Sequence, residues 1–152
     1  MMVRLWLLGS LLVVSLIGFG CIPKAQPGVT SLWVEVPSEV RLGEPVLLKL
    51  KIRNNSIWPV TLLHGYPAHN FIVTKPDNTE IWRWAKVILD IGLTTTLKPQ
   101  EQREFTGEWD QRDNQGNPVS VGTYLVQGLL HGNIFDKGGE LTTKPKRLVI
   151  KP

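Results

Sequence analysis

Cysteine and histidine are scarce in this chain of 152 residues, and their scarcity excludes several kinds of site. The single cysteine, Cys21, rules out an internal disulfide, so the core alone must stabilise the fold. Only three histidines are present, His64, His69 and His131, and their spacing matches no recognised metal site. No serine lies in a Gly-x-Ser-x-Gly element. We therefore expect no metal, no cofactor and no catalytic activity.

An excess of charge of either sign is also missing. Lys and Arg number 17 against 13 for Asp and Glu, which gives a net charge of +4. The basic residues are scattered among acidic ones, except for a short cluster between Lys144 and Lys151. Because no basic stripe or nucleic-acid-binding motif is present, we interpret the charges as a solvated surface and expect no nucleic-acid partner.

One long hydrophobic run occurs, and it ends at Cys21. Residues 1–4 form a short basic start and residues 5–20 are almost wholly apolar, which is short of the roughly 20 residues that span a membrane. This pattern, with a small residue before the cut, is typical of a secretory signal peptide. The run 17–21 resembles a bacterial lipobox, in which Gly20 precedes the cleavage and Cys21 receives the lipid, although Gly18 replaces the usual leucine. The alternative is an ordinary signal peptide followed by an incidental buried cysteine.

These features predict three parts of the chain. Residues 1–20 are the signal peptide, residues 21–28 are a lipidated tether that contains two prolines, and residues 29–152 are the folded domain. Removal of residues 1–20 leaves 132 residues, which suits one domain rather than two. The protein is thus expected to be exported and held in the bacterial cell envelope by a lipid on Cys21, which is its contact with the membrane.

The remaining chain alternates apolar and polar residues with period two. Val46, Leu48, Leu50 and Ile52 face one way, as in a strand with one buried and one solvated face. Many short strands with turns about every ten residues predict an all-β sandwich or barrel. Only residues 84–93 suggest a helical turn or two. The other expected strands are residues 31–36, 60–63, 71–74, 80–84, 94–97, 104–109, 123–130 and 147–151.

Tyr124 favours the sandwich over the barrel. It lies near the start of a long apolar strand, where immunoglobulin-like sandwiches place a tyrosine whose hydroxyl bonds back to the upstream backbone. In this arrangement Tyr124, Val126 and Leu130 face the core. We therefore predict an immunoglobulin-like antiparallel β-sandwich.

Tryptophan is abundant, with five residues beyond the signal peptide. Trp82 and Trp84 are two apart on a predicted strand and so share a face. Large aromatic side chains suit a core that has no disulfide, and we predict that Trp82, Trp84 and Trp109 are largely buried. Trp58 lies between two strands in a loop, Asn54–Pro59, and is better suited to exposure. The alternative interpretation of these residues is a stacking platform for sugar rings.

The order of several short elements along the chain is distinctive. Ile81-Trp82-Arg83-Trp84 is followed by Leu97-Lys98-Pro99, then by Trp109 and by Gly122-Thr123-Tyr124. This order resembles the BsuPI domain, named for an intracellular proteinase inhibitor, from about Glu44 to Gly132. The chain departs from that pattern at Asn70, Ala85 and Gln100. The resemblance implies an immunoglobulin-like β-sandwich and a protein-binding role.

Two functional hypotheses remain. The first is a non-enzymatic protein-binding module whose sharpest form is a protease inhibitor, with another protein, such as a serine protease, as partner. Its contact residues would be Tyr66, Pro67 and His69 in the segment Leu63–Asn70, together with Trp58. The second is a carbohydrate-binding module of the envelope that uses Trp58 or Trp33, or a structural lipoprotein.

Overall fold

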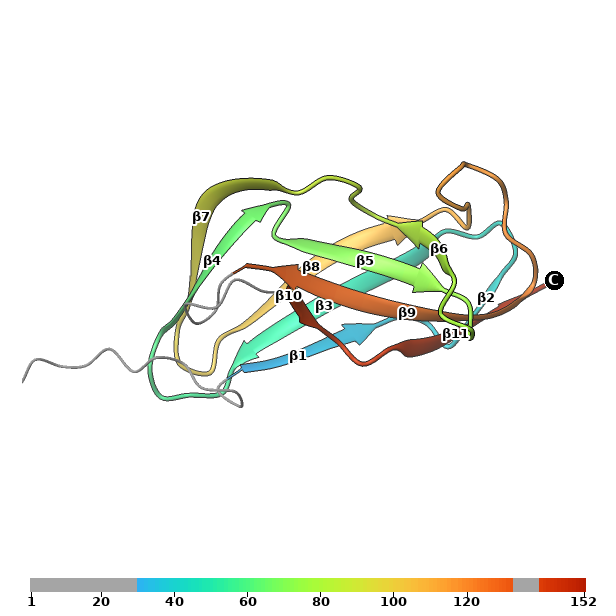
Figure 1. Ribbon diagram of the computed structural model, residues 1–152. Coiled ribbons are helices and arrows are strands. Elements are labelled where there is room, and N and C mark those ends of the chain that lie inside the picture. Colours follow the sequence, from blue (N-terminus) through green and yellow to red (C-terminus); the bar gives the residue numbers. More distant parts are fainter. Residues whose placement is uncertain (1–29, 133–139) are drawn as a thin grey trace, which may run out of the picture.

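The computed structural model describes residues 30–132 and 140–152, and every regular element in these residues is a strand (Figure 1). This confirms the all-β prediction. Cys21, the apolar run and the tether lie outside the described residues, which contain no helix long and apolar enough to cross a membrane. The strands are β1 (Thr30–Glu35), β2 (Glu39–Arg41), β3 (Val46–Asn54), β4 (Val60–Tyr66), β5 (His69–Thr74), β6 (Glu80–Arg83), β7 (Leu89–Leu97), β8 (Gln102–Trp109), β9 (Gly122–His131), β10 (Glu140–Thr142) and β11 (Lys146–Lys151).

Two sheets pack face to face and form the predicted sandwich. One has the order β1-β3-β8, and the other has the order β2-β11-β9-β5-β6 with β10 beside β9. The sheets approach closely at two glycines: a Cβ on Gly107 would lie 2.8 Å from the Phe71 ring, and one on Gly128 would lie 2.5 Å from Leu50. All pairs are antiparallel except β2 with β11. Since β2 begins four residues after β1 ends, the chain crosses to the second sheet without reversing its direction.

The core lies between the sheets and follows the predicted alternation. The four residues Val46, Leu48, Leu50 and Ile52 of β3 are all fully buried, whereas Leu47 between them is exposed. Tyr124, Val126 and Leu130 of β9 face the same core, and the Tyr124 hydroxyl donates to the Ser120 carbonyl at 2.8 Å. The tyrosine predicted from the sequence therefore closes back onto the upstream backbone as expected. The core comprises Val34, Val46, Leu48, Leu50, Ile52, Val60, Leu62, Phe71, Val73, Leu97, Trp109, Tyr124, Val126, Leu130, Leu148 and Ile150.

The helical turn expected in residues 84–93 is absent. Residues 89–97 instead form β7, which pairs with β4 and extends the strand predicted at residues 94–97. Ile91 and three consecutive threonines favour a strand, and the partner strand satisfies their backbone groups. The two three-residue strands, β2 and β10, were not expected, because each is too short to show a period.

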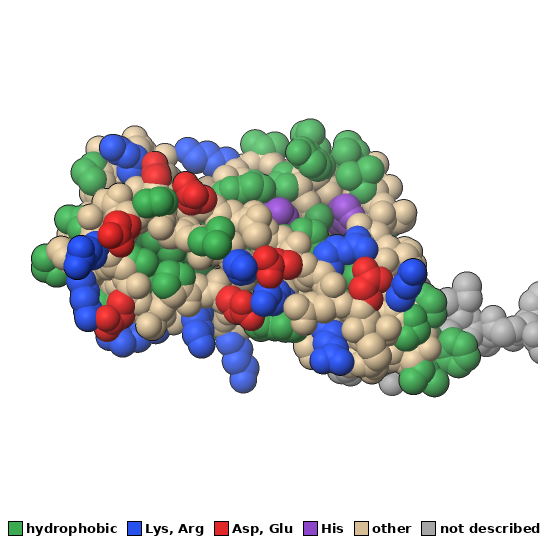
Figure 2. Space-filling model, turned by 180° about the vertical axis from the view of Figure 1, so that it is seen from behind, with side chains coloured by type: hydrophobic (Ala, Val, Ile, Leu, Met, Phe, Trp, Pro, Cys, Tyr) green, Lys and Arg blue, Asp and Glu red, His purple; other side chains and the backbone are tan. Residues whose placement is uncertain are grey.

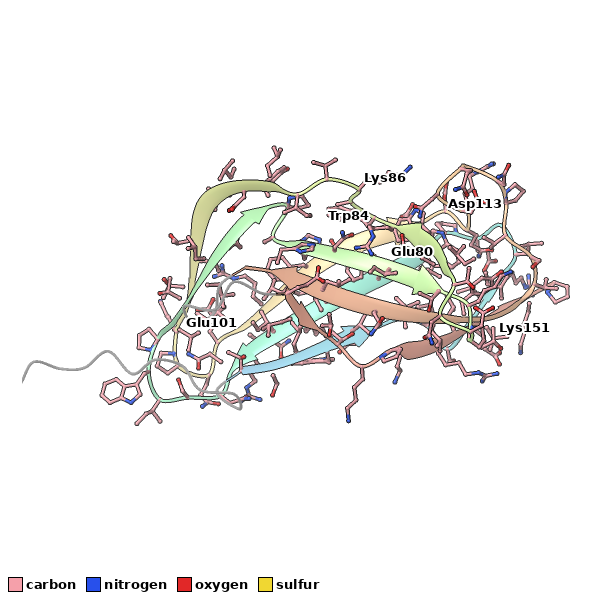
Figure 3. The ribbon with its side chains drawn as sticks, viewed as in Figure 1. Glu80, Trp84, Lys86, Glu101, Asp113 and Lys151 are labelled. Carbon is pink, nitrogen blue, oxygen red and sulfur yellow. The ribbon has the colours of Figure 1, made fainter. Side chains whose placement is uncertain are left out.

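Trp84 is also placed differently from the prediction. Trp109 is fully buried and Trp82 packs against the core, but Trp84 is 37% exposed. The chain bends after β6 ends at Arg83, so the Trp84 ring lies over the edge where β5 meets β8 rather than between the sheets (Figure 3). Its burial was therefore predicted wrongly.

Candidate protein-binding site

Strands β4 and β7 form a two-stranded ribbon that belongs to neither sheet. It runs along one end of the molecule (Figure 1). Within residues 30–132 and 140–152, β7 pairs only with β4, so its other edge carries no neighbouring strand. The first six residues of β7 are all exposed, on both faces of the ribbon. Among the described residues, nothing pairs with the backbone of β7 along this edge, and such an edge can accept a strand of another chain.

A bulge interrupts the ribbon next to its tip. His64 pairs with Leu93 and Tyr66 pairs with Leu89, so residues 90–92 of β7 stand opposite Gly65 alone. A Cβ on Gly65 would lie 2.5 Å from the carbonyl oxygen of Leu89, and only glycine allows this approach. The extra residues bend the strand and direct its side chains outward.

The ribbon exposes a set of large apolar side chains. Figure 2 shows hydrophobic side chains gathered over the upper part of this end of the molecule. Scattered single apolar residues on a surface are ordinary, whereas a gathered group makes this ribbon the candidate for an interaction surface. The exposed members on the ribbon are Leu63, Tyr66, Leu89, Ile91 and Leu93, and Val87 is exposed just before β7 begins.

Three of the four predicted contact residues lie together at the tip of this ribbon. Tyr66 ends β4 and is exposed, whereas Pro67 and His69 are half-buried. The segment predicted as a contact loop is mostly strand, because only residues 67 and 68 connect β4 to β5. The peptide bond between Tyr66 and Pro67 is cis. Of the three residues, Tyr66 presents the largest free surface.

His69 supports the tip rather than facing solvent. Its imidazole stacks between Trp84 and Phe105, with ring centroids 4.7 Å and 4.9 Å away, and its Nε2 donates to the Thr106 carbonyl at 3.3 Å. Burial lowers the pKa of His69 below its usual value. A neutral ring held between two aromatic rings fixes the start of β5 beside the ribbon.

The other two histidines are also engaged within the fold. The Nε2 of His64 lies 3.0 Å from the Thr95 hydroxyl, which ties β4 to β7. His131 Nδ1 lies 2.9 Å from Glu140, and burial lowers the pKa of this imidazole. No group of three metal-binding side chains occurs in the part of the chain that the structure describes.

Trp58 lies apart from the other predicted contact residues. It is exposed in the loop before β4, and the seven residues of β4 place it roughly 20 Å from the tip. Trp33, the other candidate for sugar stacking, is half-buried, and its indole N–H donates to Glu35 at 3.1 Å. Sequence reasoning did not identify Leu89 and Ile91, although the alternation Leu89-Asp90-Ile91 was a signal for a strand.

Comparison with known proteins gives one family and several similar folds. No curated protein sequence matches the chain. Spo0M, a sporulation control protein from Bacillus subtilis, has a TM-score of 0.50 at 13% identity, over 83% of this chain and 51% of its own. The alkylpurine DNA glycosylase AlkC from Pseudomonas fluorescens has a TM-score of 0.48 at 15% identity, over 82% of this chain and 31% of its own. At these identities the first likeness shows the fold alone, and the second carries no argument.

A family model, unlike these similar structures, identifies the family of this chain. The model of BsuPI, described as intracellular proteinase inhibitor, matches residues 34–134, and this range includes both strands of the ribbon. The match covers most of the described residues and agrees with the resemblance of the tryptophan and proline elements. The chain therefore belongs to the BsuPI family of proteinase inhibitors.

Proposed function

We propose that this protein is a non-enzymatic binding module that inhibits a peptidase through the β4–β7 ribbon. The observation that carries the proposal is the unpaired apolar edge of β7. An open edge recognises an extended peptide segment or a facing strand through backbone hydrogen bonds, with side-chain pockets adding selectivity. A peptidase cleft binds extended chains, so the edge of β7 has the geometry of a peptidase ligand.

The ribbon is suited to this role because it is rigidly mounted. Val60 and Leu62 of β4 and Leu97 of β7 are buried in the core, whereas the residues of β7 toward the bulge are exposed. A ligand that already holds its bound conformation loses little conformational entropy when it binds. We expect an inhibitor of this kind to resist cleavage, because pairing with β4 and the burial of Leu97 hold β7 in place.

We further propose that the protein is exported and anchored in the bacterial envelope through Cys21. The apolar run 5–20 and the lipobox-like residues 17–21 support this. Two or more acyl chains give stable anchoring, whereas a domain without them would be released. A Cys21→Ser variant should lose the lipid and change its fractionation, and wild-type migration and membrane fractionation of this variant would contradict the proposed anchor. The proposed target is accordingly a peptidase outside the cytoplasm, although the family is named for an intracellular inhibitor.

Inhibition is tested by titrating the protein into a subtilisin-type serine protease. Leu89→Ser, on the ribbon, is compared with Leu47→Ser, because both leucines are exposed to nearly the same extent, 53% and 51%. Leu47 lies on the outer face of β3, away from the ribbon. Since burying a leucine contributes about 1.5–3 kcal/mol, Leu89→Ser should weaken inhibition about tenfold or more, and Leu47→Ser should leave it unchanged.

Two results would overturn the proposal. The first is steady cleavage of the protein as an ordinary substrate, with no dose-dependent loss of protease turnover. The second is inhibition that both leucine variants weaken equally, which would place the contact surface elsewhere. Circular dichroism of both variants separates either result from loss of the fold.

A further inference from the structure

The loop between β3 and β4 presents two adjacent apolar side chains to solvent. Ile57 is 76% exposed and Trp58 is 56% exposed. Within the described residues, no other large hydrophobic side chain is as exposed as Ile57. This loop lies at the opposite end of β4 from Tyr66, so it is separate from the tip of the ribbon.

A network of hydrogen bonds centred on the buried Asn54 holds this loop in place. The Asn54 side-chain Nδ2 donates to the carbonyls of Trp58 at 2.7 Å and Lys98 at 3.0 Å. Its Oδ1 accepts from the backbone N–H and the hydroxyl of Ser56, at 2.9 Å and 2.7 Å. The Gln100 amide donates to the Asn55 carbonyl at 3.0 Å. The fold therefore fixes Ile57 and Trp58 outside the hydrophobic core formed by the described residues.

The described part of the chain begins beside this loop. Thr30 is the register partner of Asn54, and the Asn55 side chain donates to the Ser31 hydroxyl at 2.7 Å. Nine residue steps separate Thr30 from Cys21, and an extended chain of that length spans at most about 30 Å. A lipid on Cys21 would therefore hold this end of the molecule near the bilayer, so the inference rests on the proposed anchor.

The chemistry of this end suits an anionic lipid surface. Arg53 and Lys98 are exposed on either side of the loop, and Arg103 nearby pairs with Glu101, so the local charge is positive. Tryptophan prefers the membrane interface, because its ring is apolar and its N–H is polar. In Figure 3, Glu101 marks the end of the molecule that carries the loop, and Asp113 marks the opposite end. The opposite end has polar hairpin tips at residues 75–79 and 113–117.

We propose that residues 54–59 form a second membrane contact, in which Ile57 and Trp58 enter the interface of an anionic phospholipid bilayer. The lipid on Cys21 confines the domain to the surface, and the loop fixes its orientation. The long axis of the sandwich then points away from the membrane, since β1 and β3 both meet the loop at one end. In this orientation Leu97 lies beside the membrane-facing loop, and the exposed residues of β7 toward Leu89 lie farther from the membrane, where a protein partner can reach them.

The experiment uses the full chain, reconstituted into phosphatidylcholine and phosphatidylglycerol vesicles whose acyl chains carry bromine near the headgroup. Bromine quenches only nearby indoles, and the difference between wild type and Trp58→Phe isolates the fluorescence of Trp58. This difference should fall by about half or more in brominated vesicles, as for an interfacial indole. The matched control is the double variant Trp58→Phe and Leu42→Trp, which moves the indole to an exposed site at the opposite end. That indole should not be quenched.

The outcomes separate the loop from the anchor, because the mass of the same samples reports the lipid on Cys21. If Trp58 is quenched no more than the indole at position 42, the membrane contact of the loop is wrong, whether or not Cys21 is acylated. If Trp58 is quenched although Cys21 is unmodified, the loop contact is supported and the lipid anchor fails. Ile57→Ser should reduce the quenching of Trp58 and leave protease inhibition unchanged; unchanged quenching would remove Ile57 from the contact.

Discussion

The ring of Tyr124 meets the indole of Trp109 edge to face, with the two centroids 5.6 Å apart. Trp109 ends β8 in one sheet, and Tyr124 lies near the start of the long strand β9 in the other. The polar group of each ring also has a hydrogen-bond partner. The Trp109 N–H donates to the Arg112 carbonyl at 2.7 Å, and the Tyr124 hydroxyl donates to the Ser120 carbonyl. This aromatic pair joins the two sheets in a chain that cannot form an internal disulfide.

We expect Trp109→Ala to be far more damaging than Trp84→Ala. Removal of a fully buried tryptophan leaves a large cavity and typically costs about 3–5 kcal/mol. Trp84 is partly exposed at the sandwich edge, so its removal should cost about 1–2 kcal/mol. Urea denaturation of both variants measures the difference. Equal losses of unfolding free energy would show that Trp84 supports the fold as much as the core residue does.

Tyr124→Phe should lower the free energy of unfolding by about 1 kcal/mol, because the Ser120 carbonyl loses its donor while the ring remains packed. Tyr66→Phe is the control, since the Tyr66 ring is exposed, and its change should stay within about 0.5 kcal/mol. Thermal denaturation of the two variants makes the comparison. A neutral Tyr124→Phe would mean that this hydroxyl contributes nothing to stability.

Asn54→Ala should destabilise the protein by about 2–3 kcal/mol, because several groups that depend on the buried amide lose their partner at once. Asn55→Ala, one residue along and exposed, is the matched control and should cost little. Hydrogen exchange should show faster exchange of the Ser56 amide in the first variant only. Unchanged exchange would mean that the loop does not depend on Asn54.

Stability should fall on acidification below about pH 6.5, the ordinary pKa of histidine. Burial lowers the pKa of His69 and His131, so the unfolded chain takes up protons more readily than the folded one. Stability is therefore complete above the unfolded pKa and is lost as the pH falls toward the folded pKa. For His131, burial is the larger effect, with Nε2 buried without a hydrogen-bond partner among the described residues; the Glu140 carboxylate beside Nδ1 raises the pKa and only partly offsets it.

Melting temperatures between about pH 8 and about pH 5 measure this dependence. His131→Gln should reduce the fall in stability, since one of the two groups that favour protonation of the unfolded chain is removed. His69→Gln should act in the same direction. A wild-type protein that becomes more stable through this pH range would contradict the assigned direction of both pKa shifts.

The parts of the fold that the sequence could predict are those with one strictly buried face. The alternation in β3 and the apolar run of β9 each predict which side chains are buried. Tyr124 predicts the hydrogen bond from the start of β9 back to the upstream backbone at Ser120. Only residues 94–97 of β7 were predicted as a strand. The bulge at residues 90–92 breaks the alternation of apolar and polar residues, and the exposed first six residues give no pattern of burial. Trp84 was misplaced because period two on a strand says nothing about where the strand ends.

The candidate site was predictable only where it is local in sequence. Tyr66, Pro67 and His69 lie together because they belong to one tight connection between β4 and β5. Leu89 and Ile91 join them only through the long-range pairing of β7 with β4. Such pairing depends on contacts between distant segments, which no single window of the sequence contains.

The bulge opposite Gly65 also determines how far association can proceed. A flat, open strand with apolar side chains is a template on which further copies of a chain add and grow into a fibre. Here the backbone at Gly92 is left-handed, so this stretch departs from a flat strand, and Asp90 brings a carboxylate to it. Irregular backbone and charge both oppose pairing of two copies of β7 edge to edge. We therefore expect the irregular edge to disfavour edge-to-edge growth of copies of this chain, while a partner whose shape follows the bulge can still pair with it.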